Sequence, residues 1–439
     1  MNETHNSSDL TVSDAVRGGI EPASASTCAP SMMRIAFASM IGATLEWYDF
    51  ILYNAMAALV FNALFFPSFD PLIGTVLAFS TYAVGYVSRP VGGVVFGWAG
   101  NRFGRKAVLL VTLFVMGLSS LAIGILPTYE SVGIAAPLML VILRFLQGMA
   151  LGGDWAAAVL LAAENGDQKK RGLNASFAQV GPAAGTLLAT GTLWIVTANT
   201  SHSGFQEYGW RIPFTLSALL VIAGLWVRRT IVETPVASAG ASKRVRSPIR
   251  AVFRHHKRSL LVAGGMRIGT DVLYALLATF SLTYVSQILH LPKSLALSGV
   301  LAGAVAQLFL VPMFGTLSDK IGQRVIYAVG ALAGIVSAAC MFWLLDTRNP
   351  TLIVVALIFG LSAHAAMYGV QSALVTRQFD EGVRFAGSSL AYTFAGVVGG
   401  GFAPLIITAL YSHFSSTASI SAYVIASLIL TLACLRLAR

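Results

Sequence analysis

Two carboxylates lie close together in a stretch of sequence that is otherwise apolar. Glu46 and Asp49 are three residues apart, and Tyr53 follows four residues later. In a helix this spacing places all three side chains on one face. Two neighbouring carboxylates resist ionising together, so one of them can load and release a proton near neutral pH. The spacing therefore favours proton coupling through Glu46 or Asp49; the equal alternative is a carboxylate that pairs with an arginine to hold helices together.

Two arginines also lie inside apolar stretches. A buried guanidinium needs an anionic partner, so Arg89 and Arg144 are expected to face either the carboxylates Glu46 and Asp49 or the carboxylate of a bound molecule. For Arg89 structural pairing is an equal alternative, because Pro90 follows directly and two glycines lie just beyond it.

The second half of the chain offers further polar groups in apolar surroundings. Arg267 and Asp271 are four residues apart, so we expect them to neutralise one another without a role in the function. His364 lies among small apolar residues, where a hydrogen-bonded packing role is the favoured reading. Tyr274 and Gln371 can bind an oxygen-rich molecule, although hydrogen bonds between helices explain them equally well.

The composition identifies the class of protein. The chain has 439 residues, of which 56% are hydrophobic and 11% are charged, whereas soluble domains are roughly 25% charged. The apolar residues come in runs of about 20, enough to cross a membrane. The net charge of +11 comes from short basic clusters between these runs, which argues against nucleic acid as a partner. No metal-ligand cluster, nucleophile–base pair or phosphate loop is visible, so neither enzyme activity nor a metal or cofactor is expected.

The apolar runs predict an all-α membrane protein with twelve transmembrane helices in two six-helix, pseudo-symmetric bundles. The domains expected are a disordered tail (1–32), an N-terminal bundle (33–229), a basic linker (230–258) and a C-terminal bundle (259–437). Lys and Arg gather in the loops on one side of the membrane, so both termini are expected on the cytoplasmic side. The membrane expected is the inner membrane of the cell. The predicted spans are 33–62, 71–97, 107–127, 134–160, 173–198, 211–229, 259–288, 296–317, 325–345, 351–376, 385–412 and 418–437.

A loop motif occurs twice at identical spacing. The sequence GWAGNRFGRK follows the second predicted span, and GTLSDKIGQR follows the eighth. In each copy the glycines allow a turn and close approach, and the polar residues can cap helix ends or pair with carboxylates. The residues singled out are Gly97, Asn101, Arg102, Gly104 and Arg105 in the first copy, and Gly315, Asp319, Gly322 and Arg324 in the second.

This repeat resembles the loop signature of the major facilitator superfamily. Within it, the chain is similar to metabolite:proton symporters, which include carriers of shikimate, dicarboxylates and 2-oxoglutarate. The resemblance rests on segments such as EWYDF from Glu46, RPVGG from Arg89 and RFLQG from Arg144. The chain departs from the family pattern at Asn101, Gln323, Asp154 and Arg377. The candidate gating residues are those of the two loop motifs together with Asp154, Glu164 and Arg171.

The resemblance implies a secondary active transporter that takes up a small carboxylate-bearing metabolite together with protons, by alternating access between the two bundles. The expected partners are therefore an organic acid, protons and the lipid bilayer, and the chain is expected to act as a monomer. Gly181-Pro182 resembles part of an antiporter motif, so proton-driven efflux is the alternative. A sensor that has kept the carrier scaffold is a third reading.

Overall fold

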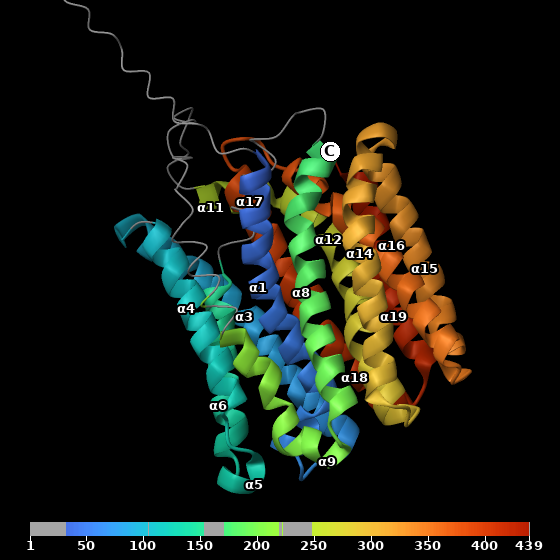
Figure 1. Ribbon diagram of the computed structural model, residues 1–439. Helices are drawn as coiled ribbons and strands as arrows, with labels where there is room; N and C mark the ends of the chain where they lie inside the picture. Colours follow the sequence, from blue (N-terminus) through green and yellow to red (C-terminus); the bar gives the residue numbers. More distant parts are fainter. Residues whose placement is uncertain (1–31, 104, 153–170, 219–221, 223–247, 439) are drawn as a thin grey trace, which may run out of the picture.

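The computed structural model describes residues 32–103, 105–152, 171–218, 222 and 248–438, and within these ranges every regular element is helical (Figure 1). The predicted tail and most of the linker lie outside the described residues. So do Gly104, Asp154 and Glu164, together with the surroundings of Gly97 and the side chains of Asn101, Arg102, Arg105 and Arg171.

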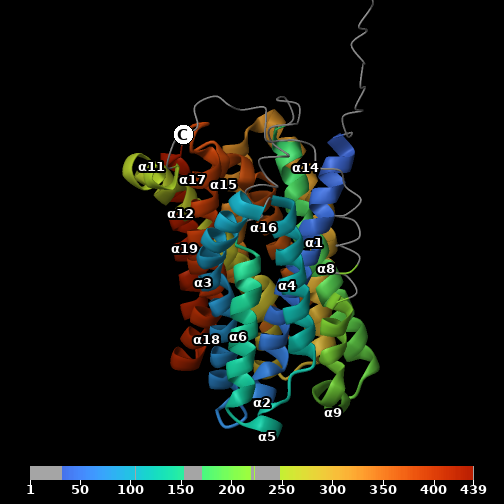
Figure 2. The same ribbon diagram turned by 90° about the vertical axis from the view of Figure 1, so that its left-hand side faces the viewer.

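Long helices run side by side along one common direction, as apolar runs in a membrane require, because every backbone polar group must be paired inside its own segment (Figures 1 and 2). Within the described part of the chain, eight helices are long and apolar enough to cross a membrane, and two shorter apolar helices accompany them. The N-terminal elements are α1 (Met32–Leu59), α2 (Phe61–Phe65), α3 (Pro71–Phe103), α4 (Arg105–Gly124), α5 (Tyr129–Val132), α6 (Ala135–Ala150), α8 (Arg171–Asn199), α9 (His202–Gly204) and the π-helix η2 (Phe205–Gly209); residues 211–218 begin a further helix.

The C-terminal elements begin inside the predicted linker, where α11 (Pro248–His255) forms a short helix of its own. Two of the predicted spans contain π-helical stretches, which often mark functional sites. These are α12 (Lys257–Tyr274), η3 (Ala275–Phe280), α13 (Ser281–Thr283) and η4 (Tyr284–Ile288) in one span, and α17 (Arg384–Ala395), η5 (Gly396–Gly401) and α18 (Ala403–Phe414) in the other. The remaining helices are α14 (Lys293–Ile321), α15 (Gln323–Asp346), α16 (Pro350–Thr376) and α19 (Thr417–Leu437).

Glycines set the closest helix contacts in the N-terminal bundle. A Cβ atom at Gly92 of α3 would stand 1.9 Å from the carbonyl oxygen of Met149 on α6, and one at Gly148 of α6 would stand 2.0 Å from the carbonyl oxygen of Gly85. The absence of side chains thus lets the two backbones touch, so α3 packs tightly on α6 at the glycines that follow Arg89.

The second copy of the loop motif turns the chain from α14 into α15. Gly322 has φ +100°, a conformation that side-chain-bearing residues rarely adopt. Asp319 accepts a hydrogen bond from the backbone N–H of Leu173 at the start of α8 (3.1 Å), and Arg324 donates to the carbonyl of Ala438 (2.6 Å). The motif therefore caps helix ends, as predicted, and Asp319 reaches from one bundle to the other.

Candidate functional site

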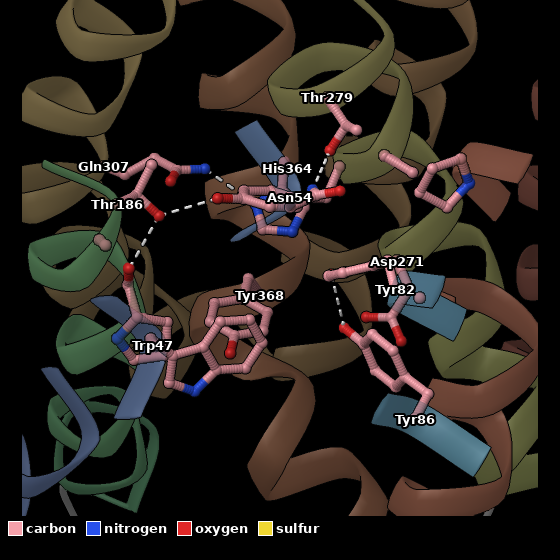
Figure 3. Close-up of a pocket in the computed structure, with 16 residues that line it drawn as sticks. Trp47, Asn54, Tyr82, Tyr86, Thr186, Asp271, Thr279, Gln307, His364 and Tyr368 are labelled. Carbon is pink, nitrogen blue, oxygen red and sulfur yellow. Dashed lines mark hydrogen bonds between the residues drawn. The ribbon is translucent and has the colours of Figure 1, made fainter. Parts of the chain in front are cut away.

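A cavity lies between the two bundles, and both contribute to its wall (Figure 3). Aromatic and neutral polar side chains dominate the lining, which suits a small oxygen-rich molecule. From the N-terminal bundle come Trp47, Asn54, Tyr82, Tyr86, Pro182, Ala183 and Thr186; from the C-terminal bundle come Asp271, Tyr274, Ala275, Thr279, Gln307, His364, Tyr368, Gly400 and Pro404.

Two hydrogen bonds in this wall join the bundles. The hydroxyl of Tyr274 on α12 lies 2.8 Å from that of Thr186 on α8, and Asn54 of α1 donates to the hydroxyl of Thr279 on η3. Thr186 also donates to the carbonyl of Pro182 within α8 (2.9 Å), so Tyr274 supplies the hydrogen of the contact between the bundles.

The C-terminal side of the cavity carries an ion pair. Nε of Arg267 lies 2.8 Å from Oδ2 of Asp271, as the four-residue spacing predicts. Arg267 also donates to the carbonyl of Tyr392, and its guanidinium lies over that residue's ring at 3.1 Å. Arg267 is 1% exposed behind the wall, and Asp271 is the member of the pair that lines the cavity.

Arg144 lies one aromatic layer behind the opposite side of the cavity. Its side chain is fully buried, and its guanidinium lies 4.0 Å, 4.2 Å and 4.9 Å from the ring centroids of Phe50, Tyr53 and Tyr82. Among the described residues it forms no salt bridge, and its Nε and Nη2 atoms have no hydrogen-bond partner. A buried cation in this state needs a negative charge nearby.

Polar side chains lead from Arg144 toward Asp49. Nη1 of Arg144 donates to Gln147 (3.1 Å), and the amide of Gln147 donates to Ser120 (2.6 Å), which lies close to Asp49. Ser217 donates to Oδ1 of Asp49, while Oδ2 is buried without a partner among the described residues. The structure thus brings the predicted carboxylate and the predicted arginine into one buried polar cluster.

The other predicted site residues occupy different surroundings. Glu46 is half-buried on α1, and Tyr53 is buried and hydrogen-bonded to Thr81 (2.5 Å). Arg89 lies over the rings of Phe50 and Tyr86 at 4.4 Å and 4.1 Å. Gln371 is buried, with no hydrogen-bond partner for its amide among the described residues.

Of the residues predicted to bind the substrate, Tyr274 alone lines the described cavity, and the predicted roles of all of them, Tyr274 included, stay predictions. Sequence reasoning did not select Trp47, Asn54 or Thr186 for this wall. Tyr82 and Tyr86 carried a usable signal, because two tyrosines four residues apart share one helix face.

At the end of the molecule that carries α2 and η4, three further hydrogen bonds join the bundles. Gln287 donates to the carbonyl of Ala58 (2.8 Å) and accepts from Thr75 (3.2 Å), and Lys293 donates to the carbonyl of Leu59 (3.0 Å). A cation at the carboxyl end of α1 is also favoured by the helix dipole. These bonds hold the bundles together beyond the cavity.

Comparison with known proteins decides the family. A sequence model described as Major Facilitator Superfamily matches residues 36–404. The chain belongs to this superfamily. As a member of the major facilitator superfamily it is a multi-pass membrane transporter and not an enzyme, and its twelve-helix fold follows.

Curated superfamily relatives match over nearly their whole length. The chain is 37% identical over 407 residues to the "Shikimate transporter" of Escherichia coli, covering 91% of this chain and 92% of that protein. It is 36% identical over 391 residues to the "Inner membrane metabolite transport protein YhjE" of the same organism, covering 88% and 89%. Secondary transport of a small molecule is therefore the function class.

Solved superfamily structures show the same fold. The crystal structure of a D-xylose-proton symporter matches with a TM-score of 0.71 at 17% identity and covers 91% of this chain and 97% of the other. An inward open structure of the xylose transporter XylE from E. coli matches with a TM-score of 0.70 at 16% identity, covering 91% and 95%.

Proposed function

We propose that this transporter takes up a small carboxylate-bearing metabolite together with protons. The observation that carries the proposal is the state of Arg144, a fully buried guanidinium with two unpartnered nitrogens and no salt bridge within the described part of the chain. Tyr82 touches this guanidinium and also lines the cavity, so the positive charge lies directly behind the wall. This charge would stabilise an anion in the cavity, because the attraction between opposite charges is stronger in apolar surroundings than in water.

The position of Asp49 supports proton coupling. When Asp49 is ionised, its charge compensates Arg144 through the cluster that contains Gln147 and Ser120. When Asp49 takes up a proton, that compensation is lost and the binding of an anionic substrate becomes more favourable. Proton and substrate therefore favour one another, which is the linkage that symport needs. Glu46, one helical turn earlier, is the second candidate carrier of the proton.

Transport then proceeds by alternating access. The bundles rock about the cavity, and the hydrogen bonds from Gln287 and Lys293 to the end of α1 open when that end of the molecule opens. At the other end the contact between Asp319 and Leu173 opens in its turn. The 37% identity to a shikimate transporter supports a hydroxylated or cyclic acid as substrate.

We place the monomeric transporter in the inner membrane, with both termini, the tail 1–32 and the linker 230–258 on the cytoplasmic side. Arg250 and Arg254 are exposed on α11, which packs on α17. A basic helix at this position suits contact with anionic lipid headgroups, each charge contributing about 1 kcal/mol. The bundles 33–229 and 259–437 are the two bodies that move.

The test is transport by purified protein in proteoliposomes. We expect an imposed inward proton gradient to drive accumulation of at least one of shikimate, benzoate, succinate and citrate, and an uncoupler to abolish that accumulation. A thermal-shift screen of the same acids at pH 5.5 and pH 8 should give a stabilising compound whose effect is larger at the lower pH. Accumulation that ignores the proton gradient would contradict the proposal.

A specific packing feature favours efflux as the second candidate. A Cβ atom at Gly181 would stand 2.6 Å from the Cβ of Ala43, and one at Gly185 would stand 2.8 Å from the carbonyl of Thr44, so α8 lies directly against α1. Such a tight contact is what the antiporter motif produces. Inverted vesicles that accumulate the substrate on energisation would establish efflux, and a ligand response without any flux would establish a sensor.

A further inference from the structure

We propose that His364 is a neutral hydrogen-bond donor of fixed orientation that binds an acceptor oxygen of the transported molecule, and that Gln307 is its positioning residue. The inference rests on the proposed function in one respect, namely that a transported molecule enters the cavity. It assigns one contact of that molecule and requires no change in the charge of His364.

The amide of Gln307 can have only one orientation. Its Nε2 atom lies 3.0 Å from the carbonyl oxygen of Leu361 and 2.8 Å from Nδ1 of His364. A rotated amide would place its oxygen against the carbonyl of Leu361, two acceptors in contact, which is unfavourable. The NH₂ group therefore donates one hydrogen to Leu361 and the other to His364.

This orientation decides the tautomer of His364. Because Nδ1 accepts a hydrogen from Gln307, it carries no proton, so the proton of the neutral imidazole is on Nε2. His364 lines the cavity, and its Nε2 atom has no hydrogen-bond partner among the described residues. A single N–H donor is thus presented to whatever occupies the cavity.

Aromatic rings hold the imidazole in place. The ring centroid of Tyr274 lies 5.0 Å away and that of Tyr368 lies 5.1 Å away, nearly parallel to the imidazole. Tyr274 itself forms a hydrogen bond with Thr186 of the other bundle. The donor therefore has a fixed direction, which reduces the entropy that binding must overcome.

The surroundings keep the imidazole neutral. The groups that face it are Gln307 from α14, Tyr274 from α12 and Tyr368 from its own helix, and Asp271 in the same cavity wall is paired with Arg267. An imidazolium would need an acceptor at Nδ1, where Gln307 offers only hydrogens. The site therefore accepts a carboxylate, carbonyl or hydroxyl oxygen and rejects a molecule that presents only N–H groups there.

The tautomer can be tested without knowing the substrate. We would record ¹⁵N NMR spectra of the full chain, labelled at histidine and held in lipid nanodiscs, and assign His364 by difference from His364→Gln. The expected signal has one protonated and one unprotonated nitrogen and stays constant from pH 6 to pH 8. A signal that becomes doubly protonated in this range, or a proton on Nδ1, would overturn the inference.

Variants of Gln307 separate positioning from packing. Gln307→Leu removes the donor to Nδ1, so we expect a mixture of both tautomers. Gln307→Glu places an acceptor there, so we expect both nitrogens to be protonated at pH 7. If either variant leaves the His364 signal as in the wild type, Gln307 does not position the imidazole.

Binding gives the second measurement, with shikimate, succinate and citrate as probes. We expect His364→Leu to weaken binding of the stabilising probe by about tenfold to a hundredfold, and His364→Gln, whose amide can still donate, by less than about tenfold. His413→Leu, outside the cavity, is the control and should bind like the wild type. Equal affinity of His364→Leu and wild type would overturn the inference. If no probe binds the wild type, the proposed substrate class fails, and the NMR spectra still decide whether His364 is a fixed donor.

Discussion

The hydroxyl of Tyr274 donates to the hydroxyl of Thr186 across the boundary between the bundles, while Thr186 gives its own hydrogen to the carbonyl of Pro182. The two partners are therefore not equivalent. Thr186 keeps a hydrogen bond when Tyr274 is removed, whereas Tyr274 loses its acceptor when Thr186 is removed.

The first prediction uses this asymmetry. We expect Thr186→Val to lower the free energy of unfolding by about 1–3 kcal/mol, because it leaves a buried hydroxyl unpaired, and Tyr274→Phe to lower it by about 1 kcal/mol or less. The double variant should resemble Tyr274→Phe. Thermal melting of the three proteins in detergent checks the order, and a double variant as unstable as Thr186→Val would contradict it.

The second prediction concerns Arg144→Lys. Lysine keeps the charge but cannot lie flat against the rings of Phe50 and Tyr53 or supply the guanidinium nitrogens. We expect normal expression and binding of the stabilising acid weakened by about tenfold or more. Arg348→Lys, an exposed arginine outside the cavity, is the matched control. Unchanged affinity of Arg144→Lys would show that the guanidinium serves structure alone.

The third prediction separates binding from coupling. In Asp49→Asn the carboxylate can no longer take up a proton, but a polar side chain remains beside Ser217. We expect substrate counterflow to continue and proton-driven accumulation to disappear, with Glu46→Gln measured alongside to decide which carboxylate carries the proton. Asp346→Asn, which removes a carboxylate bonded to Tyr284, is the control. Normal proton uptake in both Asp49→Asn and Glu46→Gln would sink the coupling assignment.

The fourth prediction concerns the contact between η4, α14 and the end of α1. Lys293→Met removes one bond of about 1 kcal/mol and Gln287→Leu removes two, so the open state at this end should gain about fivefold in population in the first variant and more in the second. Spin labels at Ser68→Cys and Ser412→Cys, in a chain without other cysteines, would show a new longer distance. Lys293→Arg keeps the donor and should behave as the wild type; an unchanged distance distribution in Lys293→Met would count against the contact as a closing device.

The fifth prediction compares two glycines. In Gly148→Ala the new Cβ would stand 2.0 Å from the carbonyl of Gly85, so α3 and α6 must separate, and we expect a loss of about 3 kcal/mol or more, or failure to express. In Gly191→Ala the nearest neighbour is Cδ1 of Leu301 at 3.5 Å, so we expect a neutral or slightly stabilising effect. Equal stability of the two variants would contradict the packing of α3 on α6.

The sequence by itself determined the class of protein, the approximate spans, the repeat and the pairing of Arg267 with Asp271. These properties depend on local patterns. A run of about 20 apolar residues is long enough to cross a membrane. Residues four apart on a helix contact one another in any tertiary surroundings. The turn at Gly322 is likewise local, because its positive φ is a conformation that few residues other than glycine adopt.

Only the tertiary structure decided which face of each helix meets the cavity. Periodicity shows that Glu46, Asp49 and Tyr53 share a face, but not which neighbour that face contacts. Neighbouring residues point about 100° apart, so the rotation of α1 about its own axis decides whether Glu46 or Trp47 lies at the cavity wall, and the structure places Trp47 there. The contact between His364 and Gln307 joins residues 57 positions apart, and the packing of α14 on α16 brings them together. No spacing in the chain encodes such a pair, because its geometry depends on how all the helices pack at once.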